Sequence, residues 1–266
     1  MLSLPHSLHI GNLAVFLLLT LLFAGCSDQT IIPVDIHSIP SAHTGHTYEI
    51  RVRLPDNYDA SESYPVAVLL DGYYHFEDLE KTLYEERAAD VILVGIFYED
   101  YPFSATSFAQ VEEIREVDLT FPVHVSSSSG EELGGGGQQF YNFLKEELIP
   151  LIADNYQTVP EERTLLGHSL GGYFTLWQMM AHREDALFPN VVSLSPSLWW
   201  NRVGLLETEK ELADQSIALP FKLYLGIGTE EGLEANALVD ELAERLEEHQ
   251  HPGLRVKSER YQGSHL

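Results

Sequence analysis

The sequence has few cysteines, few positive charges and few long apolar runs. It holds 1 cysteine in 266 residues, so no disulfide can form within the chain, even in an oxidising compartment. Lysine and arginine together number 15 against 41 aspartates and glutamates, which gives a net charge of -26. A surface this acidic repels nucleic acid and anionic lipid headgroups, so we expect neither as a partner.

The rest of the composition is that of a globular protein. Apolar residues make up 44% and charged residues 21% of the chain, which excludes an intrinsically disordered chain and a membrane protein of many spans. A length of 266 residues suits one large α/β domain better than two independent domains.

The one long apolar run, Leu13 to Ala24, lies near the N-terminus and predicts a targeting segment. It is shorter than the roughly 20 residues of a transmembrane helix but matches the apolar part of a signal peptide. Ala24-Gly25-Cys26 follows and resembles the lipobox of bacterial lipoproteins, in which the cysteine is lipidated. We therefore expect a lipoprotein signal peptide over residues 1–25, a lipid anchor at Cys26, and a location in the bacterial cell envelope, lipid-anchored or periplasmic. The alternative is a plain signal peptide with an incidental cysteine.

Strand and helix patterns alternate from residue 31 onward, which predicts a mainly parallel sheet with helices on both faces. Tyr48 to Leu54 alternates apolar with polar residues, as in a half-buried antiparallel strand at the sheet edge. Five other predicted strands are short apolar runs: Val66 to Leu70, Val91 to Ile96, Thr164 to Leu166, Val191 to Leu194 and Phe221 to Ile227. A last strand pattern covers Leu254 to Tyr261.

Two segments have helical periodicity and one has none. Apolar residues recur on one helix face over residues 140–151 and again over residues 235–246, and Pro150 implies a kink or early break in the first helix. Pro102 to Gly137 contains a serine run and a glycine run but little periodicity. Its composition predicts a flexible functional loop.

Gly167-His168-Ser169-Leu170-Gly171 contains the Gly-x-Ser-x-Gly pattern of α/β-hydrolases. In that fold the serine lies on a strained turn between a strand and a helix, and the glycines relieve crowding there. A predicted strand enters this motif and a helix-compatible stretch leaves it. The context predicts the α/β-hydrolase fold with Ser169 as a catalytic nucleophile.

A serine hydroxyl needs a general base, and the order in this fold is nucleophile, acid, histidine. Four histidines follow Ser169: His182, His249, His251 and His265. His182 is too near the serine in sequence, and the next two belong to a polar helix end where histidine is usually solvated. His265 follows the last predicted strand and a short turn, so it is the expected base. His168, beside the serine, should point away from the site.

The acid should follow the strand that ends at Gly228, where Glu230 and Glu231 are the candidates and Glu231 is our choice. The oxyanion hole needs backbone N–H donors. The amide of Leu170, directly after the nucleophile, should supply one. The other should come from the loop after the strand at residues 66–70, with the amide of Tyr73 as the best candidate.

Several motifs resemble the putative-esterase family of α/β-hydrolases, which includes siderophore esterases, S-formylglutathione hydrolases and mycolyltransferases. They are Leu54-Pro55, Leu69-Leu70-Asp71-Gly72, Asp118-Leu119-Thr120, Glu147-Leu148-Ile149-Pro150, Gly167 to Gly172 and Ser195-Pro196-Ser197-Leu198-Trp199-Trp200. The sequence is most similar to the siderophore-esterase-like branch. The resemblance implies ester or lactone hydrolysis without a metal or organic cofactor, and some members are thought to use only a Ser–His pair.

The same resemblance suggests residues that contact substrate. Trp199 and Trp200 could stack on an aromatic acyl group, or they could simply pack the core beneath their loop. Arg115 could bind a substrate carboxylate or phenolate, or it could form an ion pair with Asp118.

We therefore expect a cofactor-free serine esterase that cleaves carboxylic esters of small molecules, with its domain over residues 26–266. Only Leu266 follows His265, whereas the family continues into a closing helix, so either the chain is truncated or the histidine lies on a loose end. The alternatives are an acyltransferase that uses the same acyl-enzyme and a catalytically inactive binding lipoprotein. The sequence does not indicate an oligomeric state.

Overall fold

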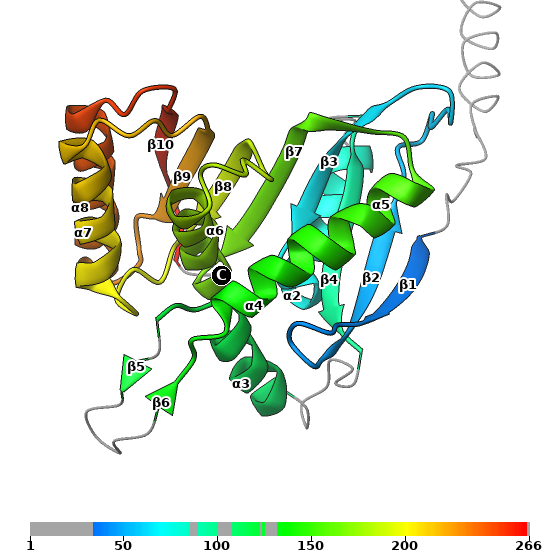
Figure 1. The fold of residues 1–266 in the computed structure, drawn as a ribbon, viewed down its shortest axis with the longest axis horizontal. Helices are drawn as coiled ribbons and strands as arrows, with labels where there is room; N and C mark the ends of the chain where they lie inside the picture. The colour runs from blue at the N-terminus through cyan, green and yellow to red at the C-terminus, as the bar shows by residue number, and fades with distance from the viewer. Residues whose placement is uncertain (1–33, 86–89, 100–107, 123, 126–131, 265–266) are drawn as a thin grey trace, which may run out of the picture. The chain divides into compact units, whose positions relative to one another are not determined.

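The computed structural model describes residues 34–85, 90–99, 108–122, 124–125 and 132–264, which belong to one compact unit. Its core is an eight-stranded sheet in the order β1-β2-β4-β3-β7-β8-β9-β10 (Figure 1). The strands are β1 (Asp35–Pro40), β2 (Thr47–Arg53), β3 (Tyr64–Leu69), β4 (Ile92–Tyr98), β7 (Thr158–His168), β8 (Asn190–Leu194), β9 (Lys222–Gly228) and β10 (Arg255–Tyr261). A separate two-stranded ribbon pairs β5 (His124–Val125) with β6 (Glu132–Leu133). The α/β fold with a mainly parallel sheet is confirmed.

Helices cover both faces of the sheet (Figure 1). They are α2 (Gly72–Glu80), the π-helical turn η1 (Lys81–Glu85), α3 (Phe108–Asp118), α4 (Gly137–Phe143), the π-helical turn η2 (Leu144–Leu148), α5 (Ile149–Asn155), α6 (Leu170–Ala181), α7 (Arg202–Asp214) and α8 (Leu233–His249). Side chains of β3 alternate between two cores, as a strand buried on both faces requires. Val66 and Val68 join the main core, while Ala67 and Leu69 pack with Phe76 of α2.

The alternating strand lies one position inside the sheet edge. β2 pairs antiparallel with β4, as its pattern predicts, but its other side pairs antiparallel with β1, which forms the edge. The prediction of an edge strand was therefore wrong. β1 escaped detection because most of its side chains are exposed, so it has no apolar run or clear alternation.

The segment predicted as an irregular loop contains helix α3. Its inward side chains include the polar Arg115 and Asp118 next to the apolar Val111, and this mixture hides the helical period of the buried face. The glycine run is not a flexible linker either. A Cβ on Gly134, at φ 70°, would lie 2.1 Å from Thr120 Oγ1 and 2.5 Å from the Trp200 ring, so glycine allows close packing there. The serine run lies outside the described residues, and only the flanking strands β5 and β6 are described.

The helix before β7 changes its winding close to Pro150. α4, η2 and α5 follow one another without a gap, and the π-helical turn η2 stands directly before the turn that contains Pro150. Proline has no N–H to donate, and a local π-turn is one way a helix accommodates that loss. The predicted kink or break therefore appears as a change of winding.

Within the described residues, no helix is both long and apolar enough to cross a membrane.

Candidate active site

Ser169 lies on a strained turn between β7 and α6. Its backbone has φ 57° and ψ -117°, a conformation that L-residues other than glycine rarely adopt and that costs on the order of 1–3 kcal/mol. The turn requires glycine on both sides. A Cβ on Gly167 would lie 2.2 Å from the Gly171 carbonyl oxygen, and one on Gly172 would lie 2.7 Å from the Leu194 carbonyl oxygen. The strand–turn–helix geometry that the motif predicts is therefore present.

The carboxyl ends of parallel strands meet at one edge of the sheet, where ligands of open α/β sheets bind. The loops after β3, β7, β8 and β9 carry Asp71, Ser169, Ser195 and Glu231 to this edge. Figure 1 shows these four strands as neighbours in the sheet. These side chains come from segments up to 160 residues apart in sequence. Because these strands are parallel neighbours, the four side chains lie along the same edge of the sheet.

The loop after β8 joins the serine to the acid, and the sequence had not indicated this role. The Ser197 amide donates to the Ser169 carbonyl oxygen at 3.0 Å, and the two serine hydroxyl oxygens lie 3.1 Å apart. Ser195, at φ 45°, donates its hydroxyl to Glu231 Oε1 and lies 2.6 Å from the Tyr261 hydroxyl. Ser195 and Ser197 flank a proline in the Ser-Pro-Ser-Leu-Trp-Trp motif. The sequence suggested a role for the two tryptophans of this motif and none for its serines.

Glu231 is held beside the turn that precedes the candidate base. Its Oε1 atom accepts from the Gly228 amide at 3.0 Å as well as from Ser195. The neighbouring Glu230 amide donates to the Gly263 carbonyl oxygen at 2.8 Å, two residues before His265. His265 itself lies outside the described residues. The acid loop and the segment that leads to His265 therefore run side by side, while the role of His265 stays a prediction.

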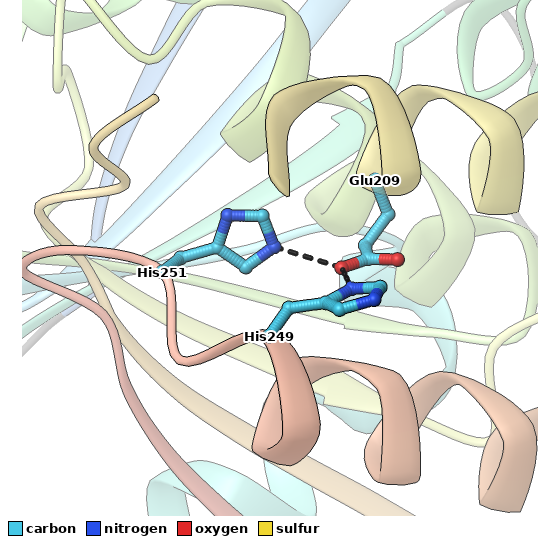
Figure 2. Close-up of side chains that lie close together, drawn as sticks. All are labelled: Glu209, His249 and His251. Carbon is cyan, nitrogen blue, oxygen red and sulfur yellow. Dashed lines mark hydrogen bonds and ion pairs between the residues drawn. The ribbon is translucent and has the colours of Figure 1, made fainter. Parts of the chain in front are cut away.

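The other histidines have partners elsewhere. His182 stacks on Tyr141 at 3.7 Å between ring centroids, and the ring of His168 meets that of His75 edge-on at 5.1 Å. The expectation that the histidines at the end of α8 are solvated was wrong for His251, which is buried, whereas the His249 side chain is partly exposed. Figure 2 shows both rings turned toward Glu209 of α7.

Both predicted oxyanion donors lie in the first turn of a helix, where amides have no acceptor within the helix. Leu170 begins α6, and Tyr73 is the second residue of α2. The two helix starts are close together, since a Cβ on Gly171 would lie 3.1 Å from Asp71 Oδ2 and 3.5 Å from Leu70 Cβ. The Tyr73 side chain points its hydroxyl to the Tyr98 carbonyl oxygen, and burial raises the pKa of that hydroxyl to about 12.

Arg115 forms a buried ion pair with Asp71, and the sequence had suggested Asp118. Its Nε and Nη2 atoms donate to the two Asp71 carboxylate oxygens at 2.6 and 2.8 Å, and its Nη1 atom donates to Glu112. Burial alone would lower the pKa of Arg115, but the carboxylates of Asp71 and Glu112 raise it well above its usual value. The pair fixes Asp71, whose φ of 57° starts α2, and neutralises a buried negative charge close to the start of α6.

Asp118 instead accepts a hydrogen bond from the Tyr48 hydroxyl at 2.6 Å.

The two tryptophans differ from each other in exposure. Trp200 is buried in the core, and its indole N–H donates to the Pro122 carbonyl oxygen, whereas Trp199 is 58% exposed. Of the two, only Trp199 is exposed enough for its ring to stack on a substrate.

A cleft of about 520 Å³ is lined in part by Tyr73. Its lining includes Gly72, Tyr73 and Phe97, together with the acids Glu49, Glu77, Asp78 and Glu99. Ser169 does not line it, and four carboxylates disfavour an anionic ligand. We therefore do not assign it as the acyl pocket.

The family model described as "Putative esterase" matches residues 41–265. The chain belongs to that family. This confirms the resemblance found in the sequence and identifies the protein as a carboxylic ester hydrolase of the α/β-hydrolase class.

Two relatives within this family resemble the chain over most of their length. Ferri-bacillibactin esterase BesA of Bacillus subtilis (strain 168) is 29% identical over 257 residues, covering 88% of this chain and 84% of BesA. The crystal structure of the BES protein from Bacillus cereus is also 29% identical and superposes with a TM-score of 0.75, covering 89% of this chain and 91% of that protein. A more distant relative, the siderophore triacetylfusarinine C esterase of Aspergillus fumigatus, is 26% identical over 189 residues, covering 66% of this chain and 62% of that protein.

Proposed function

We propose that this esterase hydrolyses the ester bonds of a siderophore through an acyl-enzyme on Ser169. The Ser169 hydroxyl attacks the ester carbonyl while His265 takes its proton, and His265 then returns the proton to the leaving alcohol. Glu231 orients His265, and the amides of Leu170 and Tyr73 hold the oxyanion. Water deacylates the serine by the reverse sequence, so no cofactor takes part. The strained elbow at Ser169 is the observation that carries this proposal.

The choice of substrate class rests on relatives and on one exposed ring. The relatives are named as esterases of ferri-bacillibactin and of triacetylfusarinine C, both siderophores. Trp199 offers its exposed indole two residues beyond Ser197, whose hydroxyl lies beside that of Ser169. Such a ring suits stacking on an aromatic acyl group. Arg115 is committed to Asp71, so we assign it to holding the loop before α2 and not to gripping the substrate.

A substrate panel tests the proposal. Purified enzyme is incubated with ferri-bacillibactin, apo-salmochelin, triacetylfusarinine C and p-nitrophenyl butyrate, and cleavage is followed by liquid chromatography with mass detection. We expect kcat/KM for at least one siderophore to exceed that for the p-nitrophenyl ester by about tenfold or more, and the Ser169→Ala variant to cleave none of them. Efficient cleavage of the p-nitrophenyl ester with all three siderophores left intact would exclude siderophore esters as the substrate class.

We further propose that the mature enzyme is anchored by a lipid on Cys26 in the cell envelope. The apolar run that ends at Ala24-Gly25-Cys26 supports this proposal, and it lies outside the described residues. Mass spectrometry of the protein expressed in its full length in a bacterial host should find diacylglycerol on Cys26 and no peptide from residues 1–25. The Cys26→Ser variant should remain unlipidated. An unmodified Cys26 within an intact N-terminal peptide would reject the anchor.

A further inference from the structure

Three ligating side chains meet at the opposite edge of the sheet from Ser169. Glu209 comes from the middle of α7, His249 is the last residue of α8, and His251 lies in the turn before β10 (Figure 2). The C-cap residue Gln250, at φ 48° and ψ 52°, reverses the chain so that the two histidines, two residues apart, face the same point. Because β10 begins just after this turn, the cluster lies at the amino-terminal edge of the sheet, whereas Ser169 follows the carboxyl end of β7.

The three side chains are close enough to share one ion. Glu209 Oε1 lies 2.7 Å from His249 Nδ1 and 2.8 Å from His251 Nε2. Ligands of a tetrahedral Zn²⁺ ion, each about 2.0–2.2 Å from the metal, lie about 3.4 Å apart, so an ion requires each of these two oxygen–nitrogen pairs to open by only about 0.6–0.7 Å. His249 is partly exposed and can make that adjustment by side-chain rotation.

The buried carboxylate needs a positive partner. The Glu209 side chain is 0% exposed, and its described ion pairs are with these two histidines, which are charged only when protonated. Its second oxygen, Oε2, is buried and has no hydrogen-bond partner among the described residues. An unpaired carboxylate in such a place is strongly disfavoured. A cation bound at Oε1 supplies the missing positive charge to the whole carboxylate. The cluster also lies at the C-terminal end of α8, where the helix dipole favours cations.

We propose that Glu209, His249 and His251 bind a zinc-class divalent ion that clamps α7 to α8 and to the start of β10. Two imidazoles among three ligands select Zn²⁺ and its transition-metal neighbours over Ca²⁺ and Mg²⁺, which prefer oxygen ligands. Water occupies the fourth position on the exposed side of His249. The ion is structural, and ester hydrolysis at the far edge of the sheet proceeds without it.

Calorimetry and thermal unfolding of the chelator-treated full chain test this site. Zinc chloride should bind at one ion per chain and raise the midpoint of thermal unfolding by several degrees, while magnesium chloride should not. His249→Gln, a change at a partly exposed position, and Glu209→Gln, which keeps the side-chain shape, should each weaken zinc binding at least tenfold. His43→Gln is the matched control, because His43 is also partly exposed and pairs with a single carboxylate, Glu146, at 3.1 Å.

Two results would overturn the proposal. One is that the wild-type chain and the His249→Gln variant bind zinc with the same stoichiometry and affinity, since the ion would then bind elsewhere. The other is a chain that neither binds zinc nor gains thermal stability from it, in which case the cluster is a hydrogen-bonded Glu–His pair network only.

Discussion

At the scale of single residues, the candidate site depends on side chains held by more than one hydrogen bond. Glu231 Oε1 accepts from the Gly228 amide and from the Ser195 hydroxyl, so the carboxylate is fixed before any base approaches it. Arg115 holds Asp71 through two parallel N–H···O contacts. Such two-point contacts limit side-chain rotation, which favours a preorganised site.

Replacing Glu231 with glutamine should separate its structural and chemical roles. The amide oxygen can still accept from Gly228 and Ser195, so the fold should persist, but the charge that stabilises an imidazolium is lost. We expect kcat to fall by about tenfold or more with KM nearly unchanged. Glu230→Gln, at the exposed neighbouring position, should retain wild-type kinetics. Equal kinetics for both variants would show that the enzyme works with a Ser–His pair alone.

Removing the Arg115 guanidinium should cost stability before it affects substrate binding. Arg115→Met leaves the buried Asp71 carboxylate without its partner, which costs on the order of 3–5 kcal/mol of unfolding free energy. The double variant Asp71→Asn with Arg115→Met should regain part of that loss. Urea unfolding of the wild type, both single variants and the double variant gives the coupling. A fully stable Arg115→Met protein with a raised KM would instead assign Arg115 to the substrate.

At the scale of elements, helix α3 presents charged groups to the core. Asp118, its last residue, is buried and hydrogen-bonded to Tyr48. Burial raises the pKa of Asp118 from 3.8 to about 7, while hydrogen bonds from Tyr48 and Tyr98 oppose the rise. The folded protein therefore retains this proton up to a higher pH than the unfolded chain does.

That difference predicts the sign of a pH effect. Between pH 3.8 and about 7 the folded state binds more protons at Asp118 than the unfolded state, so this residue makes stability fall as pH rises. Asp118→Asn removes the ionisation and keeps an oxygen acceptor for Tyr48. Relative to the wild type, the variant should gain stability at pH 8 compared with pH 4.5, as measured by urea unfolding at the two pH values. A difference between the two proteins that is the same at both pH values would contradict the raised pKa.

Most of the elements that sequence patterns predicted bury apolar side chains, although the predicted strand β10 is almost wholly exposed. The runs that became β3, β4, β8 and β9 were located to within a few residues, because strands covered on both faces must be apolar throughout. Helix α8 was found because its buried apolar residues recur on one face at the helical period. β1 and α3 were missed because one is largely exposed and the other buries polar groups. Within the site, the Ser169 turn follows from a local motif, but the contacts of Ser197 and Arg115 join residues 28 and 44 positions apart, which no local pattern encodes.

At the scale of the whole molecule, the order of strands sets where the chemistry occurs. The six neighbouring parallel strands bring the loops after β3, β7, β8 and β9 to a common edge, with the turn before His265 alongside them. The cluster of Glu209, His249 and His251 lies at the other edge, so removal of a metal ion there should leave ester hydrolysis unchanged. The acidic surface, with a net charge of -26, is consistent with a small-molecule substrate and not a nucleic acid.

Fluorophosphonate labelling followed by peptide mass spectrometry tests the nucleophile most directly. The wild-type chain should gain one adduct, on the peptide that contains Ser169, and should lose esterase activity in proportion to labelling. Ser169→Ala should take up no label and lose on the order of 10³-fold or more of kcat/KM. Ser258→Ala, which changes an exposed serine of β10, should behave as the wild type. An adduct on a different serine, or a Ser169→Ala protein with wild-type activity, would contradict the assignment of Ser169 as the nucleophile.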